Sequence, residues 1–310
     1  MKYAVVIYYF IIMSSVRMHS LLEALVAGFA FGTASIFIRY LSFYGVNSFS
    51  IAFYRLIIGS LVLVAIIYSV LRARVVVKVF DKALLNDFRV MVFMALALSL
   101  HFIFYIQSVI DTYIINATLL ANTAPVMTLI ISFFLGVARI SKVDVLGVTL
   151  GFMGAFIMVI RGLGGGGTFI GDVEALISAF LYAVYVVAGK YISTRDTVSV
   201  MCVVYSLSVP VILVYSLVVG VDISFPFSNI SALAFIIALG IIPTAIGHTL
   251  FISSLKGLRP HETSLVGLLE PVSATIYSLF LFGEVPPFES IIGGMVIALS
   301  IYIVSFKGVK

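Results

Sequence analysis

The sequence has few charged residues and no long polar segment. Only 10% of its 310 residues are Asp, Glu, Lys or Arg, whereas 63% are hydrophobic. Because soluble domains carry about 25% charged residues, this composition excludes a protein whose whole surface faces water. It also leaves no stretch that could form a separate soluble domain. The lipid bilayer is therefore the expected partner of much of the surface.

The single cysteine and the four scattered histidines exclude further classes of protein. Cys202 has no second cysteine with which to form a disulfide or a metal site, and the histidines lack the His-x-x-x-His spacing of zinc sites. The Walker motif that binds nucleotide phosphates is absent as well. We therefore expect no metal, no cofactor and no nucleotide hydrolysis.

Long apolar runs fill most of the chain. Ten runs of about 20 residues, the length that a helix needs to cross a bilayer, are separated by short segments rich in glycine, proline or charge. Because an isolated segment in lipid must satisfy its own backbone hydrogen bonds, we expect all ten to be helices. The predicted spans are 20–40, 48–70, 88–109, 113–136, 143–162, 171–191, 198–220, 230–253, 262–282 and 287–306.

The basic residues lie mostly on one side of these spans. If the N-terminus is cytoplasmic, all of the 18 Lys and Arg residues except Arg39, Arg55 and Arg161 fall in cytoplasmic loops or ends. By the positive-inside rule, we expect a multi-pass protein of the cell membrane with both termini in the cytoplasm. The net charge of +5 then reflects this topology, and no nucleic-acid partner is expected.

An internal repeat is the strongest pattern in the sequence. The segment EALVAGFAFGTASIFIRYLS at 23–42 matches EALISAFLYAVYVVAGKYIS at 174–193 without gaps, and 124–148 matches 270–294. Residues 1–17 either belong to the native protein or precede an alternative start at Met18. The resulting division is an N-terminal extension at 1–19, a first repeat at 20–162, a glycine-rich linker at 163–170, a second repeat at 171–306 and a tail at 307–310.

Each repeat contains five predicted spans. Because five is an odd number, the second repeat must enter the membrane in the opposite orientation to the first. Such inverted repeats are typical of secondary transporters, whose binding site lies where the two halves meet. The expected fold is therefore an all-α integral membrane bundle of ten transmembrane helices, built as two inverted-topology five-helix repeats. We expect a monomer to contain the whole pathway, with a dimer as the alternative.

This arrangement resembles the EamA-type members of the drug/metabolite transporter superfamily. The resemblance rests on the duplication and on the order of several segments, among them FYRLIIGSL in the second span, ATLLANTAPVMTLIISFFLG in the fourth and SLVGLLEPVSATIYSLFLFGE in the ninth. It implies transport, often export, of a small organic metabolite such as an amino acid or a related solute. The sequence departs from the family pattern at Ala138, where the family has a glutamate.

Glu270 is the first candidate for the site. Placing a charged side chain in a bilayer costs roughly 2.5–3.5 kcal/mol, and this carboxylate lies inside the ninth span. Its counterpart in the first repeat is Ala124, so the shared fold does not require a carboxylate there. We expect Glu270 to bind substrate or a proton, with a structural hydrogen bond as the alternative. Pro125 and Pro271 occupy matching positions in the two repeats and are expected to break their helices.

Other polar or aromatic residues in the spans are candidates to line the same cavity. His101 and His248 lie in corresponding helices of the two halves and could carry a proton, although packing histidines are more common. Arg55 could bind an anionic group or anchor neighbouring helices. The remaining candidates are Asn122 and four tyrosines, Tyr182, Tyr185, Tyr54 and Tyr105.

Secondary transport by alternating access is the function that these patterns favour. A proton is the expected coupling ion, with passive exchange as the alternative, and a small molecule is the expected substrate. An integral membrane enzyme acting on lipids is the rival class. It would need clustered acids, histidines or arginines near one face, and the sparse ionisable residues count against it, so we expect no enzyme activity.

Overall fold

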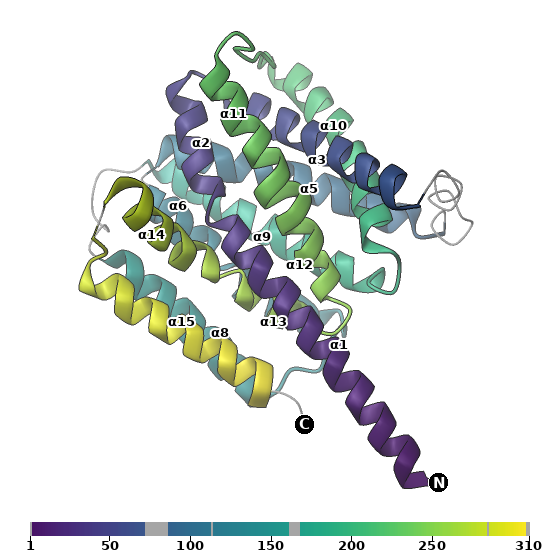
Figure 1. Cartoon of the computed structure of the whole chain (residues 1–310). Coiled ribbons are helices and arrows are strands. Elements are labelled where there is room, and N and C mark those ends of the chain that lie inside the picture. The colour runs from purple at the N-terminus through teal and green to yellow at the C-terminus, as the bar shows by residue number, and fades with distance from the viewer. Residues whose placement is uncertain (1, 72–85, 113, 161–167, 284, 308–310) are drawn as a thin grey trace.

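The computed structural model describes residues 2–71, 86–112, 114–160, 168–283 and 285–307, which are helical apart from short turns and loops (Figure 1). Within these ranges, nine helical segments are long and apolar enough to cross a membrane. The prediction of a multi-pass, all-helical membrane protein is therefore confirmed. The predicted glycine-rich linker lies mostly outside the described residues.

The first predicted span consists of two helices rather than one. Helix α1 runs from Lys2 to Phe31 and α2 from Ala34 to Phe43, and the N-terminal part of α1 extends away from the bundle (Figure 1). The turn between them contains Gly32, where a Cβ atom would collide with the side chain of Ser273. The predicted boundary at residue 20 is not a helix boundary, because α1 continues through it.

The fourth and ninth spans are also interrupted. The fourth consists of α6 (Ile114–Ala121) and α7 (Ala124–Phe134), and the ninth of α13 (Pro260–Val266) and α14 (Leu269–Phe282). Each interruption precedes a proline: Pro125 and Pro271 lie in the first turns of α7 and α14, where the missing N–H costs no helical hydrogen bond. Both helices are thus interrupted shortly before the prolines at which the sequence predicts a break.

The eighth span contains a stretch of wider helix. It begins as α11 (Ile230–Leu239), continues as the π-helix η2 (Gly240–His248) and ends as α12 (Thr249–Ser254). Such π-helical turns are rare and are frequent at functional sites. The π-helix contains Pro243.

The remaining helices are continuous, and four of them begin with a side-chain cap. Asn47, Ser141, Thr168 and Asp196 each accept a hydrogen bond from a backbone N–H in the first turn of the helix that follows, which stabilises the start of that helix. These helices are α3 (Ser48–Leu71), α5 (Phe88–Asp111), α8 (Lys142–Val159), α9 (Phe169–Tyr191), α10 (Thr197–Val219) and α15 (Phe288–Lys307).

The packing of the helices follows a pattern that recurs between the two parts of the chain. Helix α3 packs against α10, α7 against α13, and α8 against α15. Helix α5 packs against α9, and η2 and α12 pack against α1. The backbones of α8 and α15 approach closely at Gly154 and Gly293, because a Cβ atom on either glycine would collide with the carbonyl oxygen of the other. Small residues allow such close helix contacts in membranes.

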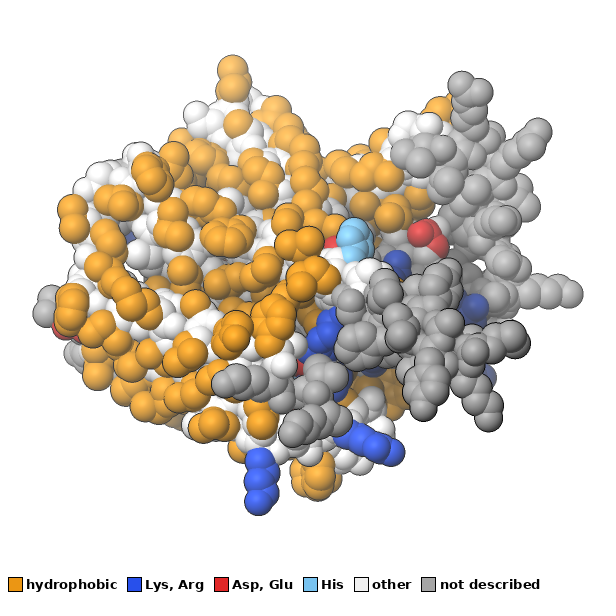
Figure 2. Space-filling view, turned by 60° about the horizontal axis from the view of Figure 1, so that its bottom comes forward, with side chains coloured by type: hydrophobic (Ala, Val, Ile, Leu, Met, Phe, Trp, Pro, Cys, Tyr) orange, Lys and Arg blue, Asp and Glu red, His pale blue; other side chains and the backbone are white. Residues whose placement is uncertain are grey.

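The outer surface is largely apolar. Hydrophobic side chains cover most of the face shown in Figure 2, and the charged side chains gather in one area of it. Large apolar side chains on several helices, such as Phe134, Leu217 and Phe280, are strongly exposed. This distribution fits a surface that contacts lipid rather than water.

Candidate functional site

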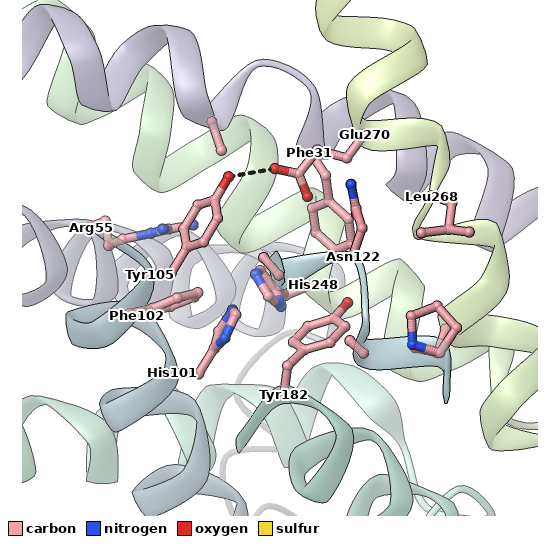
Figure 3. A pocket seen from close by; sticks show the side chains of 16 residues that line it. Phe31, Arg55, His101, Phe102, Tyr105, Asn122, Tyr182, His248, Leu268 and Glu270 are labelled. Atoms are coloured by element: carbon pink, nitrogen blue, oxygen red, sulfur yellow. Dashed lines mark hydrogen bonds between the residues drawn. The ribbon is translucent and has the colours of Figure 1, made fainter. Parts of the chain in front are cut away.

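A cavity lies inside the bundle where helices from both repeats meet (Figure 3). Its volume of about 60 Å³ is several times what a single water molecule requires. Helices α1, α2, α3, α5, α6 and α7 contribute side chains from the first repeat. Helices α9, α13 and α14 and the π-helix η2 contribute side chains from the second.

Glu270 is one of the polar residues that line the cavity. It lies in the first turn of α14, and its Oε1 accepts a hydrogen bond of 2.8 Å from the hydroxyl of Tyr105 on α5 (Figure 3). Its other carboxylate oxygen accepts no hydrogen bond from the residues that the structure describes. That oxygen is therefore available to a molecule in the cavity, or to a proton.

Arg55 brings a positive charge from α3 to the same cavity. Its side chain is only 2% exposed, and its guanidinium lies over the ring of Phe102 with Cζ 3.8 Å from the ring centre. This contact adds a cation–π attraction. Arg55 and Glu270 make no direct ion pair in the described part of the chain, so the two charges face the cavity separately.

The π-helix fixes the position of the Arg55 guanidinium. Arg55 Nε donates a hydrogen bond of 3.0 Å to Thr244 Oγ1 in η2. Thr244 is itself held from two sides, because its hydroxyl donates to the carbonyl of Leu239 and its own carbonyl accepts from Tyr205 Oη at 2.7 Å. The other guanidinium N–H groups have no acceptor among the described residues and remain available as donors.

The two histidines have different surroundings. His101 Nδ1 lies 3.0 Å from the carbonyl oxygen of Ser178 and 2.9 Å from its hydroxyl. Because a carbonyl oxygen can only accept, the proton is placed on Nδ1, and Nε2 is left as an acceptor. His248 is buried, its Nδ1 has no partner among the described residues, and its ring packs against Phe31 and Phe102 with centroids 4.7 and 5.0 Å away. His101 therefore offers a hydrogen-bonding atom, while His248 contributes mainly an aromatic surface.

Asn122 and Tyr182 also line the cavity. Asn122 lies in the turn between α6 and α7, and its buried Nδ2 has no partner among the described residues. The Tyr182 ring on α9 packs against His101 with centroids 4.8 Å apart. Figure 3 shows Tyr182 and Asn122 on the side of the cavity away from Arg55.

Tyr185 lies behind the cavity lining. Its hydroxyl donates to the sulfur of Met201 at 3.6 Å, and its ring contacts His248. Pro125 lines the cavity, whereas Pro271 does not. Of the residues that the sequence singles out, the structure thus places side by side Glu270, His101, His248, Arg55, Asn122, Tyr105, Tyr182 and Pro125.

Sequence reasoning did not single out Thr244 or Phe102, although each contacts Arg55. It named Tyr105 only as one of several tyrosines, although Tyr105 lies four residues after His101 and therefore on the same face of α5. No comparable signal indicates Thr244. Its role depends on the packing of η2 against α3, which no local pattern reveals.

Two stretches of the chain, residues 18–160 and 169–306, match the model of the EamA-like transporter family. The chain belongs to this family. The EamA-like protein is 27% identical over 277 residues to an "Uncharacterized transporter" of Archaeoglobus fulgidus, and the match covers 88% of this chain and 91% of that protein. A second "Uncharacterized transporter" of the same organism is 25% identical, and the match covers 62% of this chain and 67% of that protein.

A solved structure described only as "Crystal structure of protein" has the same fold as this EamA-like protein. The two superpose with a TM-score of 0.74 over 94% of this chain and 96% of the other, at 19% sequence identity. The family match over two repeats confirms the resemblance that the sequence motifs indicate. The protein is therefore a membrane transporter with two EamA repeats.

Proposed function

We propose that this protein is a secondary transporter that moves a small polar organic solute across the cell membrane by alternating access, with the cavity as its binding site. The placement of Arg55 and Glu270 carries this proposal. One charge comes from each repeat, and both face one cavity without forming an ion pair. Isolated charges are costly inside a membrane. A molecule that hydrogen-bonds to both would offset part of that cost.

The unpaired groups define what the cavity would bind. Arg55 requires an acceptor, whereas the free oxygen of Glu270 and the Nε2 of His101 accept from a donor. The rings of Phe31 and Phe102 would cover an apolar body. A small molecule that carries both an anionic and a donor group, such as an amino acid or a related solute, meets these requirements.

Two inverted five-helix repeats are the proposed basis of alternating access. The matching interruptions before Pro125 and Pro271 support a common fold for the halves. The recurring packing supports it as well, because the contact of α5 of the first repeat with α9 of the second corresponds to that of α12 of the second repeat with α1 of the first. Helices α3 and α10, and α8 and α15, are then counterparts that pack against each other. Such an arrangement offers two equivalent packings, one open to each side.

The remaining proposals concern orientation, coupling and assembly. The positive-inside rule supports cytoplasmic termini in the cell membrane. Glu270, with one oxygen free and the other bonded to Tyr105, is the proposed carrier of a coupled proton. Side chains of one chain suffice to line the cavity, which supports function as a monomer.

Solute counterflow tests the proposed function. Proteoliposomes are loaded with a mixed metabolite extract and exposed to the same extract with isotope labels, and uptake is read by mass spectrometry. We expect labelled compounds of one chemical class to accumulate, and Arg55→Met to abolish their accumulation. If correctly folded protein accumulates no compound from either side, the proposed function is wrong.

A further inference from the structure

Four charged residues form a buried network at one end of the bundle, away from the charges of the cavity. Arg17 of α1 binds Glu262 of α13 through two hydrogen bonds, the shorter of 2.7 Å. Arg259, which precedes α13, binds both carboxylate oxygens of Asp144 at the start of α8, at 2.6 and 2.7 Å. Arg259 also donates to Glu262 at 2.9 Å. We call these four residues the α13 network.

The carboxylates of the α13 network are isolated from water. The side chains of Asp144 and Glu262 are 0% and 1% exposed, and the two arginines are 24% and 22% exposed. Burial alone would lower the pKa of Arg259, but the hydrogen bonds to Glu262 and Asp144 outweigh it and raise that pKa. The network thus pairs two arginines with two carboxylates, and the buried ring of His261 lies beside it, with Nε2 3.6 Å from Asp144 Oδ1. Removing one partner of such a buried pair is strongly destabilising, because it leaves the other charge buried and uncompensated.

The α13 network holds together helices of both repeats. Arg17 additionally donates to the carbonyl oxygen of Ser305 in α15, so α1, α8, α13 and α15 are all connected. In the proposed orientation these contacts lie on the cytoplasmic side, near the basic residues that the positive-inside rule assigns to it.

Helix α13 extends from this network to the cavity. All of its residues, Pro260–Val266, are buried, and it packs against α1, α7, α8, α9 and α15. Ser264, two residues after Glu262, already lines the cavity. The hydroxyl of Ser264 accepts from Thr128 of α7 at 3.3 Å, and the hydroxyl of Thr263 lies 3.0 Å from that of Ser254. Tightly packed polar contacts thus separate the cavity from this end of the molecule.

We propose that the α13 network is a gate: it keeps the cavity closed on the side where it lies, and its ion pairs must separate when the cavity opens to that side. The inference rests on the proposed alternating access. Opening on this side requires α13 of the second repeat to move from α1 and α8 of the first, and those are the helices that the network joins. Weakening one pair therefore shifts the population toward the state that is open on this side.

The test uses a cysteine reporter in the cavity and requires no substrate. Ala121 lines the cavity and belongs to none of the helices that the network joins, so Ala121→Cys is introduced together with Cys202→Ala. A membrane-impermeant maleimide is added to one face of vesicles of known orientation. Ser193→Cys, predicted on the same face as the network, verifies access to that face.

Two charge-removing variants weaken the gate, and one matched variant serves as control. Glu262→Gln and Arg259→Gln each remove ion pairs of the network. Arg195→Gln instead breaks the pair between Arg195 and Asp87, which has a similar 2.6 Å distance but side chains that are 36% and 25% exposed. Exposed pairs contribute little, so the control should not change the labelling rate.

We expect Glu262→Gln and Arg259→Gln to accelerate labelling of the reporter from the network side by about tenfold or more, and to slow it from the other side. Labelling at the unmodified rate, in protein that elutes as a single folded peak, would overturn the gate. An equal acceleration by Arg195→Gln would overturn it as well. If the glutamine variants fail to fold, Arg259→Lys, which keeps the charge but loses the paired hydrogen bonds, is expected to give a smaller acceleration in the same assay, and the unmodified rate there would overturn the gate.

The gate and the proposed function can fail independently. If counterflow detects no substrate but the reporter responds as expected, the gate stands and transport of the tested solutes is excluded. If counterflow succeeds but the labelling rates do not change, transport stands and the α13 network is only a structural contact.

Discussion

Arg55 shows how a single buried cation is held in an apolar interior. The guanidinium donates a hydrogen bond to Thr244 and lies face-on against the ring of Phe102. Its other N–H groups remain open to the cavity. Removing one contact without removing the charge would leave a buried donor unsatisfied. Such a donor costs about 1–3 kcal/mol.

Thr244→Val should therefore destabilise the protein, because valine has the shape of threonine but cannot accept the hydrogen bond from Arg55 Nε. We expect the temperature at which half of the protein is lost to fall, as measured by size-exclusion chromatography after heating. Thr244→Ser keeps the hydroxyl, so its midpoint temperature should stay close to that of the unmodified protein. Equal midpoints for the valine and serine variants would show that the contact with Arg55 contributes nothing.

Tyr105→Phe removes the only hydrogen bond that the described residues donate to the Glu270 carboxylate. A hydrogen bond to a charged group is worth about 1.5–3 kcal/mol, so the carboxylate should lose its fixed orientation in the cavity. We expect the half-saturating substrate concentration in counterflow to rise about tenfold or more. Tyr215→Phe, which removes a hydroxyl outside the cavity, should change it less than about twofold. The prediction is wrong if the two variants behave alike.

At the scale of the helices, apolar composition indicates where the spans lie, whereas only Pro125 and Pro271 indicate where two of them are interrupted. Apolar composition defines each span, and the residues before the turn at Asn122 are as apolar as those after it. The turn at Gly32, which lies against Ser273, and the π-helix around Thr244, whose carbonyl accepts from Tyr205, instead involve contacts between spans distant in sequence. Local propensity does not contain these contacts.

The close approach of α8 and α15 gives a prediction with a control in the next residue. A Cβ atom at Gly293 would collide with the backbone of Gly154, whereas a Cβ atom at Gly294 would meet only Val272, at an ordinary 3.8 Å. Gly293→Ala should therefore separate the two helices and cost about 1–3 kcal/mol. Gly294→Ala should be tolerated.

Heating followed by size-exclusion chromatography compares the two alanine variants directly. We expect a lower midpoint temperature for Gly293→Ala alone. If Gly293→Ala is as stable as Gly294→Ala, the contact between α8 and α15 is looser than the structure indicates.

The candidate site was only partly predictable from the sequence, for a physical reason. Glu270, Arg55 and His101 stand out because ionisable groups are rare in apolar spans. Tyr105 and Phe102 have the same residue types as the many aromatic side chains that face lipid. Only the three-dimensional packing shows that these two contact the charges.

At the scale of the whole molecule, the proposed inversion places equivalent residues on opposite sides of the membrane. Ser42 and Ser193 end the two matching segments, and each hydroxyl donates to the carbonyl oxygen three residues earlier, at 2.8 Å. Their local structures are thus alike. The inverted topology nevertheless predicts that Ser42 lies outside the cell and Ser193 inside.

Cysteine labelling of intact cells tests this topology. In a Cys202→Ala background, a membrane-impermeant maleimide should label Ser42→Cys in intact cells and Ser193→Cys only after the cells are opened. Labelling of both in intact cells, or of neither, would exclude the inverted arrangement.

The central claim is that the cavity between the repeats is the transport site, and Glu270→Gln in counterflow tests it most directly. Glu23→Gln is the matched control, because Glu23 is another partly buried carboxylate, bonded to Ser253, but it does not line the cavity. We expect Glu270→Gln to lose at least about 90% of the counterflow of the identified solute, and Glu23→Gln to retain most of it. Wild-type counterflow by Glu270→Gln, from either side of the membrane and at every pH tested, would contradict the account.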